Sequence, residues 1–390
     1  MAVNNLSTVN LTRVLREVYL HPGVSRVEVA RSLGLNKSTV SNIVSLLRDV
    51  GVVYTGDHGA AGPSGGRRPV HLAVNANWGS VLGISLQPEG FSVTGLDLTG
   101  KAIFSTSDTL DLSATSAATA CADIVRQYRP RIEAAGGPLI GVGIGLPGFV
   151  APDDGVLHAS MPLESYEPVN FVDHVQSQLR LSVPVLIEND ANCGCWAELI
   201  VPQSTRPTNF AFLLGEVRRI STSRRDRVLA IGFGLMLGGR VHYGRQFSAG
   251  EFHSVVGPPG GLSQLSIDAQ DLPRLFHDPS IDARVSDELA SHLALLANLL
   301  DLDGIVIGGQ LAALTNQIAP RVAWHIRSAW KYPLEIDCPV SAARMGSLSV
   351  AYGAAAMFLE RLITVPQLGE LHAARQGIGL VMRAQAAIEG

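Results

Sequence analysis

The chain has 390 residues, of which 46% are hydrophobic and 16% charged, and its formal net charge at pH 7 is −4. This composition excludes a disordered chain, and the length predicts more than one folding unit. Residues 1–75 hold eight Lys or Arg and four Asp or Glu, whereas the remainder holds 22 Lys or Arg and 30 Asp or Glu. Only the N-terminal segment therefore has the net positive charge that favours a nucleic-acid partner.

The sequence also argues against a membrane or secreted protein. No apolar run approaches the length of about 20 residues that a membrane helix needs, and residues 1–10 have no signal-peptide pattern. The cysteines are too few and too scattered for a disulfide framework: Cys121, Cys193, Cys195 and Cys338. We therefore expect a cytoplasmic protein.

Three helices are predicted in the first fifty residues. Apolar residues recur at three- and four-residue spacing between Leu11 and Val18, which indicates one helical face. Ser25–Glu28 has the pattern of a capping box, in which a serine and a glutamate bond each other's backbone amides at a helix start. Gly34 ends this short helix, and Asn36 is expected to cap a third, whose buried stripe is Val40, Ile43, Val44, Leu47 and Val50.

Two short helices joined by a turn that contains glycine are typical of a helix-turn-helix. A recognition helix lies in a major groove about 12 Å wide, so its outer face needs compact donors and acceptors to contact base edges, with basic residues on phosphates. The candidate DNA contacts are Ser25, Arg26, Lys37, Ser38, Thr39, Ser41, Asn42 and Arg48. The alternative interpretation is a small helical bundle with a solvated polar face.

A β-wing is predicted after the third helix. Gly51–Tyr54 and Val70–Val74 have strand patterns, and the loop between them ends in Gly65–Pro69. Glycines allow close approach to DNA, and arginine suits a narrow minor groove, so Arg67 and Arg68 are further candidate DNA contacts. The alternative is an interdomain linker with solvated arginines. A winged helix-turn-helix domain is thus expected over residues 1–75.

Residues 78–390 have the pattern of a two-lobed α/β domain. Short strands within 81–86, 91–97 and 101–104, a helix at 117–135 and a buried strand at 139–145 suit an actin-like, ribonuclease-H-like lobe. Gly143–Gly148 fits G-x-G-x-x-G, but Pro147 and the turn residues after it oppose the helix that a dinucleotide site requires. We interpret this stretch as a loop beside a ligand cleft. The lobes are expected at about 78–185, together with the C-terminal helix, and at 186–345.

The most informative stretch for ligand binding is Val183–Asn192. An apolar strand ends at Glu188, Asn189 and Asp190, and a helix is expected to begin at Cys193. Ligands in open α/β sheets bind beyond the carboxyl ends of strands, so Asn189 and Asp190 are placed to bind a hydroxylated ligand. A simple helix cap explains the same two residues equally well.

The second lobe contains further strand and helix patterns. Strands are expected at 210–214, 228–231 and 305–309, and helices at 289–300 and 347–361. Gly232–Gly239 is interpreted as a turn between strands. Five arginines between Arg218 and Arg227 are interpreted as a solvated hairpin loop, with an interdomain or DNA-backbone contact as the alternative.

These motifs together resemble the ROK family, named for repressors, open reading frames and kinases. The resemblance spans residues 10–360 and is most specific at Glu188–Asn192, Gly143–Gly148, Ser248–Glu251, Ile307–Gly309 and the helix-turn-helix with its wing. The DNA-binding segment points to the repressor branch, because the family's kinases lack it. The resemblance implies that Asn189, Asp190 and Glu251 bind sugar hydroxyls in an interlobe cleft. In the kinases, the Asp at the position of Asp190 is the general base.

The sequence departs from the family's kinases in three regions. Ser85–Gly90 lacks the paired glycines and threonine of the first phosphate loop, and Gly232–Leu237, interpreted as the second, has Phe233 in place of threonine. Phosphoryl transfer depends on such positioning, so we predict no kinase activity and no cofactor. Residues 258–265 contain no cysteine, so we predict no zinc. The family's sugar-binding His is displaced by one position or lost, and His253 is the candidate to replace it.

The sequence therefore predicts a DNA-binding transcriptional regulator that acts as a repressor. Its predicted partners are double-stranded DNA with a near-palindromic operator, a second copy of the chain in a homodimer, and a sugar or sugar-phosphate effector. Two alternatives remain open: a sugar kinase with a DNA-binding appendage, and a regulator whose cleft has lost sugar binding.

Overall fold

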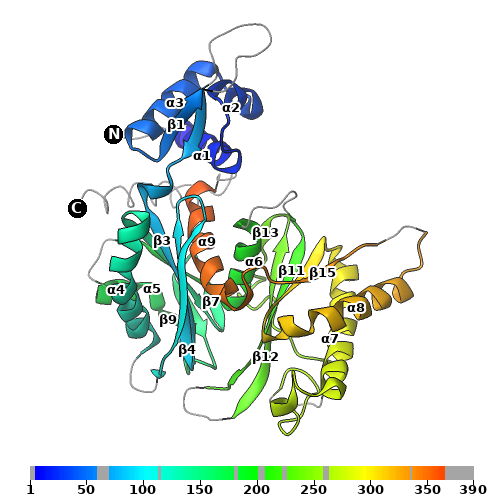
Figure 1. Cartoon of the computed structure of the whole chain (residues 1–390). Helices are drawn as coiled ribbons and strands as arrows, with labels where there is room; N and C mark the ends of the chain where they lie inside the picture. Colours follow the sequence, from blue (N-terminus) through cyan, green and yellow to red (C-terminus); the bar gives the residue numbers. More distant parts are fainter. Residues whose placement is uncertain are drawn as a thin grey trace.

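The computed structural model describes residues 5–58, 70–112, 116–179, 183–200, 207–221, 226–257, 263–333 and 336–364. Figure 1 shows a small N-terminal unit at one end of a larger body made of two lobes. Each lobe is built on its own five-stranded sheet. Within the described ranges, no helix is long and apolar enough to span a membrane.

The N-terminal unit consists of three helices and one antiparallel strand pair. Its elements are α1 (Asn5–Leu20), α2 (Arg26–Leu33), α3 (Lys37–Asp49), β1 (Val53–His58) and β2 (Val70–Val74). Val14, Val18, Val40, Val44 and Leu72 are fully buried in one apolar cluster that joins the helices to β2. The three predicted helices are therefore confirmed, and the spacing of their apolar residues explains why they pack together.

The start of α2 follows the predicted capping box. The Glu28 amide donates to the Ser25 hydroxyl over 3.3 Å, and the Ser25 amide donates to Glu28 Oε2 over 2.8 Å. Gly34 ends the helix with φ 64°, a left-handed conformation that favours glycine. Asn36 precedes α3, but its side chain makes no capping hydrogen bond. The predicted side-chain cap at Asn36 is therefore wrong.

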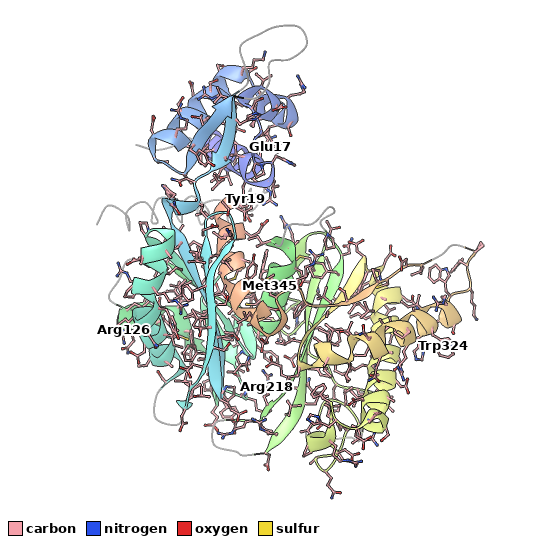
Figure 2. All side chains as sticks on the ribbon, viewed as in Figure 1. Glu17, Tyr19, Arg126, Arg218, Trp324 and Met345 are labelled. Atoms are coloured by element: carbon pink, nitrogen blue, oxygen red, sulfur yellow. The ribbon has the colours of Figure 1, made fainter. Side chains whose placement is uncertain are left out.

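The N-terminal unit is joined to the first lobe by polar and apolar contacts. Arg16 Nη1 lies 2.9 Å from Glu360 Oε1, and the Trp78 indole donates to the Val50 carbonyl over 2.7 Å. Tyr19 lies at this junction in Figure 2. The apolar cluster of the unit continues into the first lobe through Trp78 and Phe358. The short helix η1 (Ala76–Trp78) connects the two parts.

The first lobe has the strand order β10-β6-β3-β4-β5. Its strands are β3 (Ser80–Gln87), β4 (Gly90–Asp97), β5 (Ala102–Thr109), β6 (Leu139–Leu146) and β10 (Val185–Asn189). Helices α4 (Ala117–Gly136) and α5 (Phe171–Leu179) pack on one face, and α9 (Ser349–Ile363) covers the other. Because β10 pairs with β6, this lobe extends to Asn189 and not only to about residue 185. A small sheet joins β7 (Phe149–Ala151), β8 (Val156–Ala159) and β9 (Val169–Asn170).

Glycines of the first sheet allow α9 to lie directly on its strands. A Cβ atom at Gly83 would lie 2.0 Å from the Ala351 carbonyl oxygen, and one at Gly143 would lie 1.9 Å from that of Ala354. Gly143 is thus needed for helix packing. No helix follows Gly148, because the chain continues as β7. The helix that a dinucleotide site requires is therefore not found at this position, and most of Gly143–Gly148 is strand and not the predicted loop.

The second lobe has the strand order β13-β12-β11-β14-β15. Its strands are β11 (Phe210–Arg219), β12 (Arg227–Leu237), β13 (Arg240–Val241), β14 (Gly304–Gly309) and β15 (Val340–Ala342). Helices α7 (Pro279–Leu300) and α8 (Thr315–Ala329) pack on one face, as Figure 1 shows. Short helices occur at η3 (Leu272–Arg274), η4 (Gln310–Leu314) and η5 (Gly346–Leu348).

Two predictions for the β11–β12 hairpin are wrong. Gly232–Leu237 is not a turn but part of β12, paired along its length with β11, and the turn is confined to Gly238 and Gly239. The stretch interpreted as the second phosphate loop is thus a straight strand. Arg218, Arg219 and Arg227 lie in strands and not in a solvated loop. Arg224 and Arg225 lie outside the described residues.

Two helices form the layer between the lobes. Helix α6 (Asp190–Ile200) begins at Asp190, three residues before the predicted start, because β10 ends only at Asn189. It packs against α9, and a Cβ atom at Gly353 of α9 would lie 1.7 Å from the Cys193 carbonyl oxygen. Cys193 and Cys195 are fully buried here, and burial raises the pKa of both thiols. Both cysteines therefore serve packing.

Candidate functional site

The candidate site lies where β10 meets α6, at the carboxyl end of a parallel strand. Asn189 Oδ1 accepts the amides of Ala191 and Asn192 over 2.9 and 3.2 Å, and Asn189 Nδ2 donates to the Gly148 carbonyl. Asp190 Oδ1 accepts the Ala191 amide over 2.9 Å. Both residues thus bond the first turn of the helix. The helix-cap interpretation holds for both, and both also line a cavity.

The buried Glu188 side chain holds the junction of β10 and α6 in place through hydrogen bonds. Its buried carboxylate accepts hydrogen bonds from the Asn189 amide, Asn192 Nδ2, the Trp196 indole and the Tyr243 hydroxyl. Burial raises the pKa of Glu188, and these donors oppose that shift. The four bonds fix strand end, helix start and the second lobe relative to one another. The sequence motif contained Glu188, but its anchoring role was not predicted.

Arg218 is the residue of this site that sequence reasoning missed. Its Nη1 lies 3.2 Å from Asp190 Oδ2 and 3.0 Å from Gln87 Oε1. Gln87 Nε2 in turn donates to Asp190 Oδ2 over 3.4 Å. Gln87 ends β3 of the first lobe and Arg218 belongs to β11 of the second, so the guanidinium spans the two lobes, with Asp190 at the start of α6 between them. Figure 2 shows Arg218 between the sheets of the two lobes.

The cavity around these groups is small and polar. It has a volume of about 70 Å³, and its lining includes Asn189, Asp190, Glu216, Arg218 and Glu251. Ligand pockets commonly have volumes of roughly 300–1,000 Å³, so the arrangement is closed around its own side chains. Burial raises the pKa of Glu216, the positive charge of Arg218 opposes this rise, and the negative charge of Asp190 adds to it.

The structure brings together three of the four predicted effector residues. Glu251 lines the cavity with Asn189 and Asp190, and its backbone pairs with Gly232 of β12. His253 does not line the cavity; its side chain is exposed, and its Nδ1 lies 3.2 Å from the Ser254 carbonyl oxygen. The exposed position of His253 outside the cavity does not support the prediction that it replaces the family's sugar-binding His.

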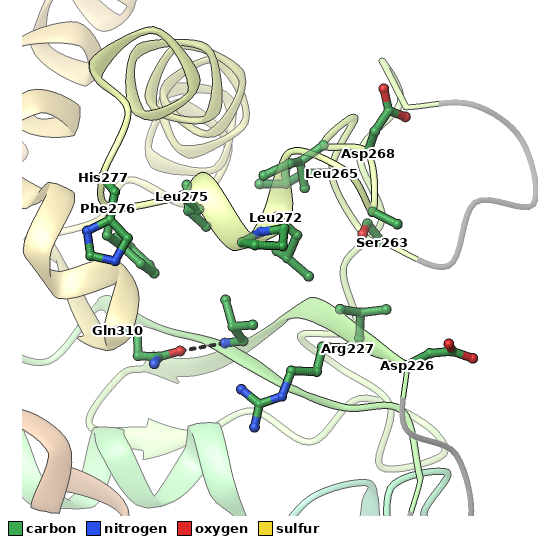
Figure 3. Close-up of a pocket in the computed structure, with 15 residues that line it drawn as sticks. Asp226, Arg227, Ser263, Leu265, Asp268, Leu272, Leu275, Phe276, His277 and Gln310 are labelled. Carbon is green, nitrogen blue, oxygen red and sulfur yellow. Dashed lines mark hydrogen bonds between the residues drawn. The ribbon is translucent and has the colours of Figure 1, made fainter.

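A second and larger pocket lies entirely in the second lobe (Figure 3). It has a volume of about 810 Å³. Leu265, Leu272, Leu275 and Phe276 form apolar parts of its lining, and Gln310 Oε1 accepts the Val217 amide at its edge over 2.7 Å. The polar lining comprises Asp226, Arg227, Ser263, Asp268, His277 and Gln310. This pocket was not predicted, because its lining comes from segments far apart in the chain.

The outer face of α3 carries most of the predicted DNA contacts. Val40, Val44 and Leu47 are buried, which turns the opposite side of the helix to solvent. The exposed predicted contacts are Lys37, Ser38, Asn42 and Arg48, and the half-buried ones are Arg26, Thr39 and Ser41.

Two groups of predicted DNA contacts stand apart from this face. Ser25 is buried, and its hydroxyl is engaged in the cap of α2, so it does not present a side chain to a ligand. Arg67 and Arg68 lie outside the described residues, as does the rest of the predicted Gly-Gly-Arg-Arg-Pro wing.

No metal site is formed by the part of the chain that the structure describes, in the sense of three or more clustered His, Cys, Asp or Glu side chains. The segment 258–265, where zinc was considered, is described only from Ser263 onward. Cys193 and Cys195, the one cysteine pair at short spacing, lie buried in the α6–α9 layer.

Comparison with known proteins identifies the family that the chain resembles. Residues 103–261 match the sequence model of the ROK family. The chain is 28% identical to a xylose repressor of Bacillus spizizenii over 244 residues, which cover 62% of this chain and 59% of that relative. The matched part therefore spans about three fifths of the relative's length. The resemblance inferred from the motifs is confirmed.

Solved structures show that the fold is shared over the whole chain. The crystal structure of a ROK family transcriptional regulator, a homolog of the E. coli MLC protein, superposes with a TM-score of 0.73 at 17% identity, covering 99% of this chain and all of that one. A ROK family glucokinase from Streptomyces griseus, in complex with glucose and AMPPNP, superposes with a TM-score of 0.55 at 17% identity and covers 72% of this chain.

Proposed function

We propose that this chain, whose central part matches the ROK family, is a sequence-specific DNA-binding transcriptional repressor that responds to a sugar effector. The observation that carries the proposal is the exposed polar face of α3, set on an N-terminal unit that packs against a sugar-kinase-like body. The similarity to a xylose repressor supports both halves of the proposal.

In this proposal the N-terminal unit is a winged helix-turn-helix. Helices α2 and α3, joined by the left-handed Gly34, form the helix-turn-helix, and the hairpin of β1 and β2 forms the base of the wing. Helix α3 enters the major groove, where Asn42 and Ser38 meet base edges and Lys37 and Arg48 meet phosphates. A homodimer presents two such helices, so the operator is near-palindromic.

We further propose that the two-lobed body senses a ligand and does not phosphorylate it. A catalytic Asp must be free to accept a proton from the attacking hydroxyl. Here Asp190 is bonded to Arg218 and Gln87. The β3–β4 turn, at the position of the kinases' first phosphate loop, has side chains engaged by arginines: Gln87 by Arg218, and Glu89 by Arg219 and Arg227.

The DNA-binding function is tested by selecting bound duplexes from a random pool and then measuring affinity for the selected site. Asn42→Ala should cost about 1–3 kcal/mol on the selected site and little on mutated sites, because it removes base-edge contacts. Lys37→Ala should weaken binding to all sequences. It should also reduce the slope of the logarithm of the binding constant against the logarithm of salt concentration by about one unit. Lys101→Ala, an exposed basic residue of the first lobe, is the control and should change neither.

Failure of the purified protein to bind any duplex at moderate salt would overturn the proposal. Equal losses for Asn42→Ala and Lys37→Ala on every sequence would show that α3 does not read bases in this orientation.

A further inference from the structure

Three arginines of the β11–β12 hairpin reach across the cleft to the first lobe; we call Arg218, Arg219 and Arg227 the arginine latch. Arg219 Nε lies 3.1 Å from Glu89 Oε1, and Arg227 Nη2 lies 2.7 Å from Glu89 Oε2. Arg218 contacts Asp190 and Gln87, as described above. Every partner of the latch belongs to β3, the turn after it or the start of α6.

The arginines of the latch differ in burial, and burial decides which ion pair contributes most to holding the lobes together. The Arg219 and Arg227 side chains are 39% and 51% exposed, and exposed ion pairs of this kind contribute little. The Arg218 and Asp190 side chains are only 22% and 7% exposed. A buried carboxylate that loses its partner is strongly destabilised, so the Arg218–Asp190 contact is the one that closes the cleft.

We propose that Arg218 is a built-in competitor of the effector, an inference that rests on the proposed sugar-sensing function. Its guanidinium lies on Asp190 Oδ2, the carboxylate oxygen that does not bond the start of α6, and the cavity that remains has a volume of about 70 Å³. A ligand enters only by replacing the guanidinium as a hydrogen-bond donor to Asp190. This requirement selects a polyhydroxylated ligand, because its neighbouring hydroxyls donate to Asp190 and accept from the asparagine amide next to it.

The displaced guanidinium has a second partner within reach. Glu216 precedes Arg218 by two residues on β11, so their side chains share one face of the strand. Both line the same cavity, with Glu251 opposite. Arg218 therefore has two carboxylates within reach: Asp190 at the start of α6, which it contacts directly when no effector is bound, and the neighbouring Glu216 on its own strand, which becomes its direct partner when the effector holds Asp190.

The switch of Arg218 from Asp190 to Glu216 links ligand binding to the relative placement of the lobes. The Asp190 pairing includes Gln87 of β3 and thereby joins the two lobes, whereas the Glu216 pairing lies within the second lobe. Effector binding thus removes a contact that holds the lobes together. A ligand shifts such an equilibrium only by its differential affinity for the two states, and the Arg218 contact supplies that difference.

The test compares the full-length protein with Arg218→Gln, which removes the charge but keeps a long polar side chain. Arg284→Gln is the matched control, because Arg284 pairs with Asp271 inside the second lobe. Without any sugar, amide hydrogen exchange around residues 85–90 and 187–192 should be about tenfold faster in Arg218→Gln and unchanged in the control. Unchanged exchange across the α4 helix verifies that the variant is folded.

The second measurement is sugar affinity by calorimetry, with D-xylose and D-glucose as probes. Arg218→Gln should bind at least one of them about tenfold more tightly than the parent, because the competing closed state is depleted. Arg218→Lys should keep most of the parent's slow exchange and weak binding. Glu216→Gln should weaken binding without changing exchange in the sugar-free protein, since it removes only the second partner.

Two results would overturn the inference. Equal exchange in Arg218→Gln and the parent would show that the contact does not close the cleft. Faster exchange combined with weaker sugar binding would show that Arg218 holds the ligand and does not compete with it. If exchange rises but neither protein binds a sugar, the closing contact stands and the sugar-sensing part of the proposed function fails.

Discussion

At the residue scale, Asp190 shows how one position serves a helix, a cavity and an interlobe contact at once. One carboxylate oxygen accepts the Ala191 amide at the start of α6, and the other meets Arg218 and Gln87. A general base must present a free oxygen to the proton of the attacking hydroxyl, and both carboxylate oxygens of Asp190 are already engaged. The same residue type at the same place in the fold therefore supports ligand binding more readily than phosphoryl transfer.

This reasoning predicts that the purified protein turns over no ATP. A coupled assay with D-xylose and D-glucose should show no sugar-dependent rate, and Asp190→Asn should leave the background rate unchanged. ATP turnover that depends on a sugar and is abolished by Asp190→Asn would establish a kinase in place of the proposed sensor.

At the scale of single elements, α2 depends on its N-terminal cap. The helix spans only Arg26–Leu33, and isolated helices of such length are unstable in water. The reciprocal bonds of Ser25 and Glu28 satisfy backbone amides that the helix itself leaves unpaired. The cap therefore contributes a large share of the local stability of the unit that presents α3.

Ser25→Ala is expected to destabilise α2 by about 1 kcal/mol, the usual loss for removing a serine N-cap. Amide exchange in α2 should accelerate roughly fivefold, while exchange in α4 stays unchanged. Ser32→Ala, at an exposed position near the other end of the same helix, is the control. Equal acceleration in both variants would mean that the cap contributes nothing beyond general helix propensity.

At the scale of the whole molecule, α9 connects the two functional sites. It packs on α6, which begins at Asp190, and its Glu360 pairs with Arg16 of α1 in the N-terminal unit. Figure 1 shows α9 below the N-terminal unit and beside α6. The two packed helices therefore form a continuous set of contacts from Asp190 to the base of the N-terminal unit.

The Arg16–Glu360 pair provides a test of this connection. Arg16→Glu should loosen the N-terminal unit, with about fivefold faster exchange in the last turns of α1, equivalent to ~1 kcal/mol for a partly buried pair. The double variant Arg16→Glu with Glu360→Arg should restore slow exchange, because the charges again attract. No rescue by the double variant would show that packing alone holds the junction.

Part of the candidate site was predictable because it is local. Asn189 and Asp190 follow an apolar strand, and that short pattern places them at the carboxyl end of β10. Arg218 was not predictable, because it lies 28 residues from Asp190 and 131 from Gln87 in sequence. His253 was a candidate because the family's motif places a histidine shortly after the glutamate, but in the structure its side chain is exposed and outside the cavity.

The sequence by itself determined the elements whose physics is local: the helices of the N-terminal unit, the capping box at Ser25, the buried strands and the helix that follows Asn189. These depend on side-chain periodicity and on hydrogen bonds between residues a few positions apart. Only the tertiary structure decided that an arginine of the second lobe contacts Asp190 and Gln87, and that Gly232–Leu237 is a strand. Both outcomes depend on which distant segments pair across the sheet and the cleft, and no short-range pattern records such pairing.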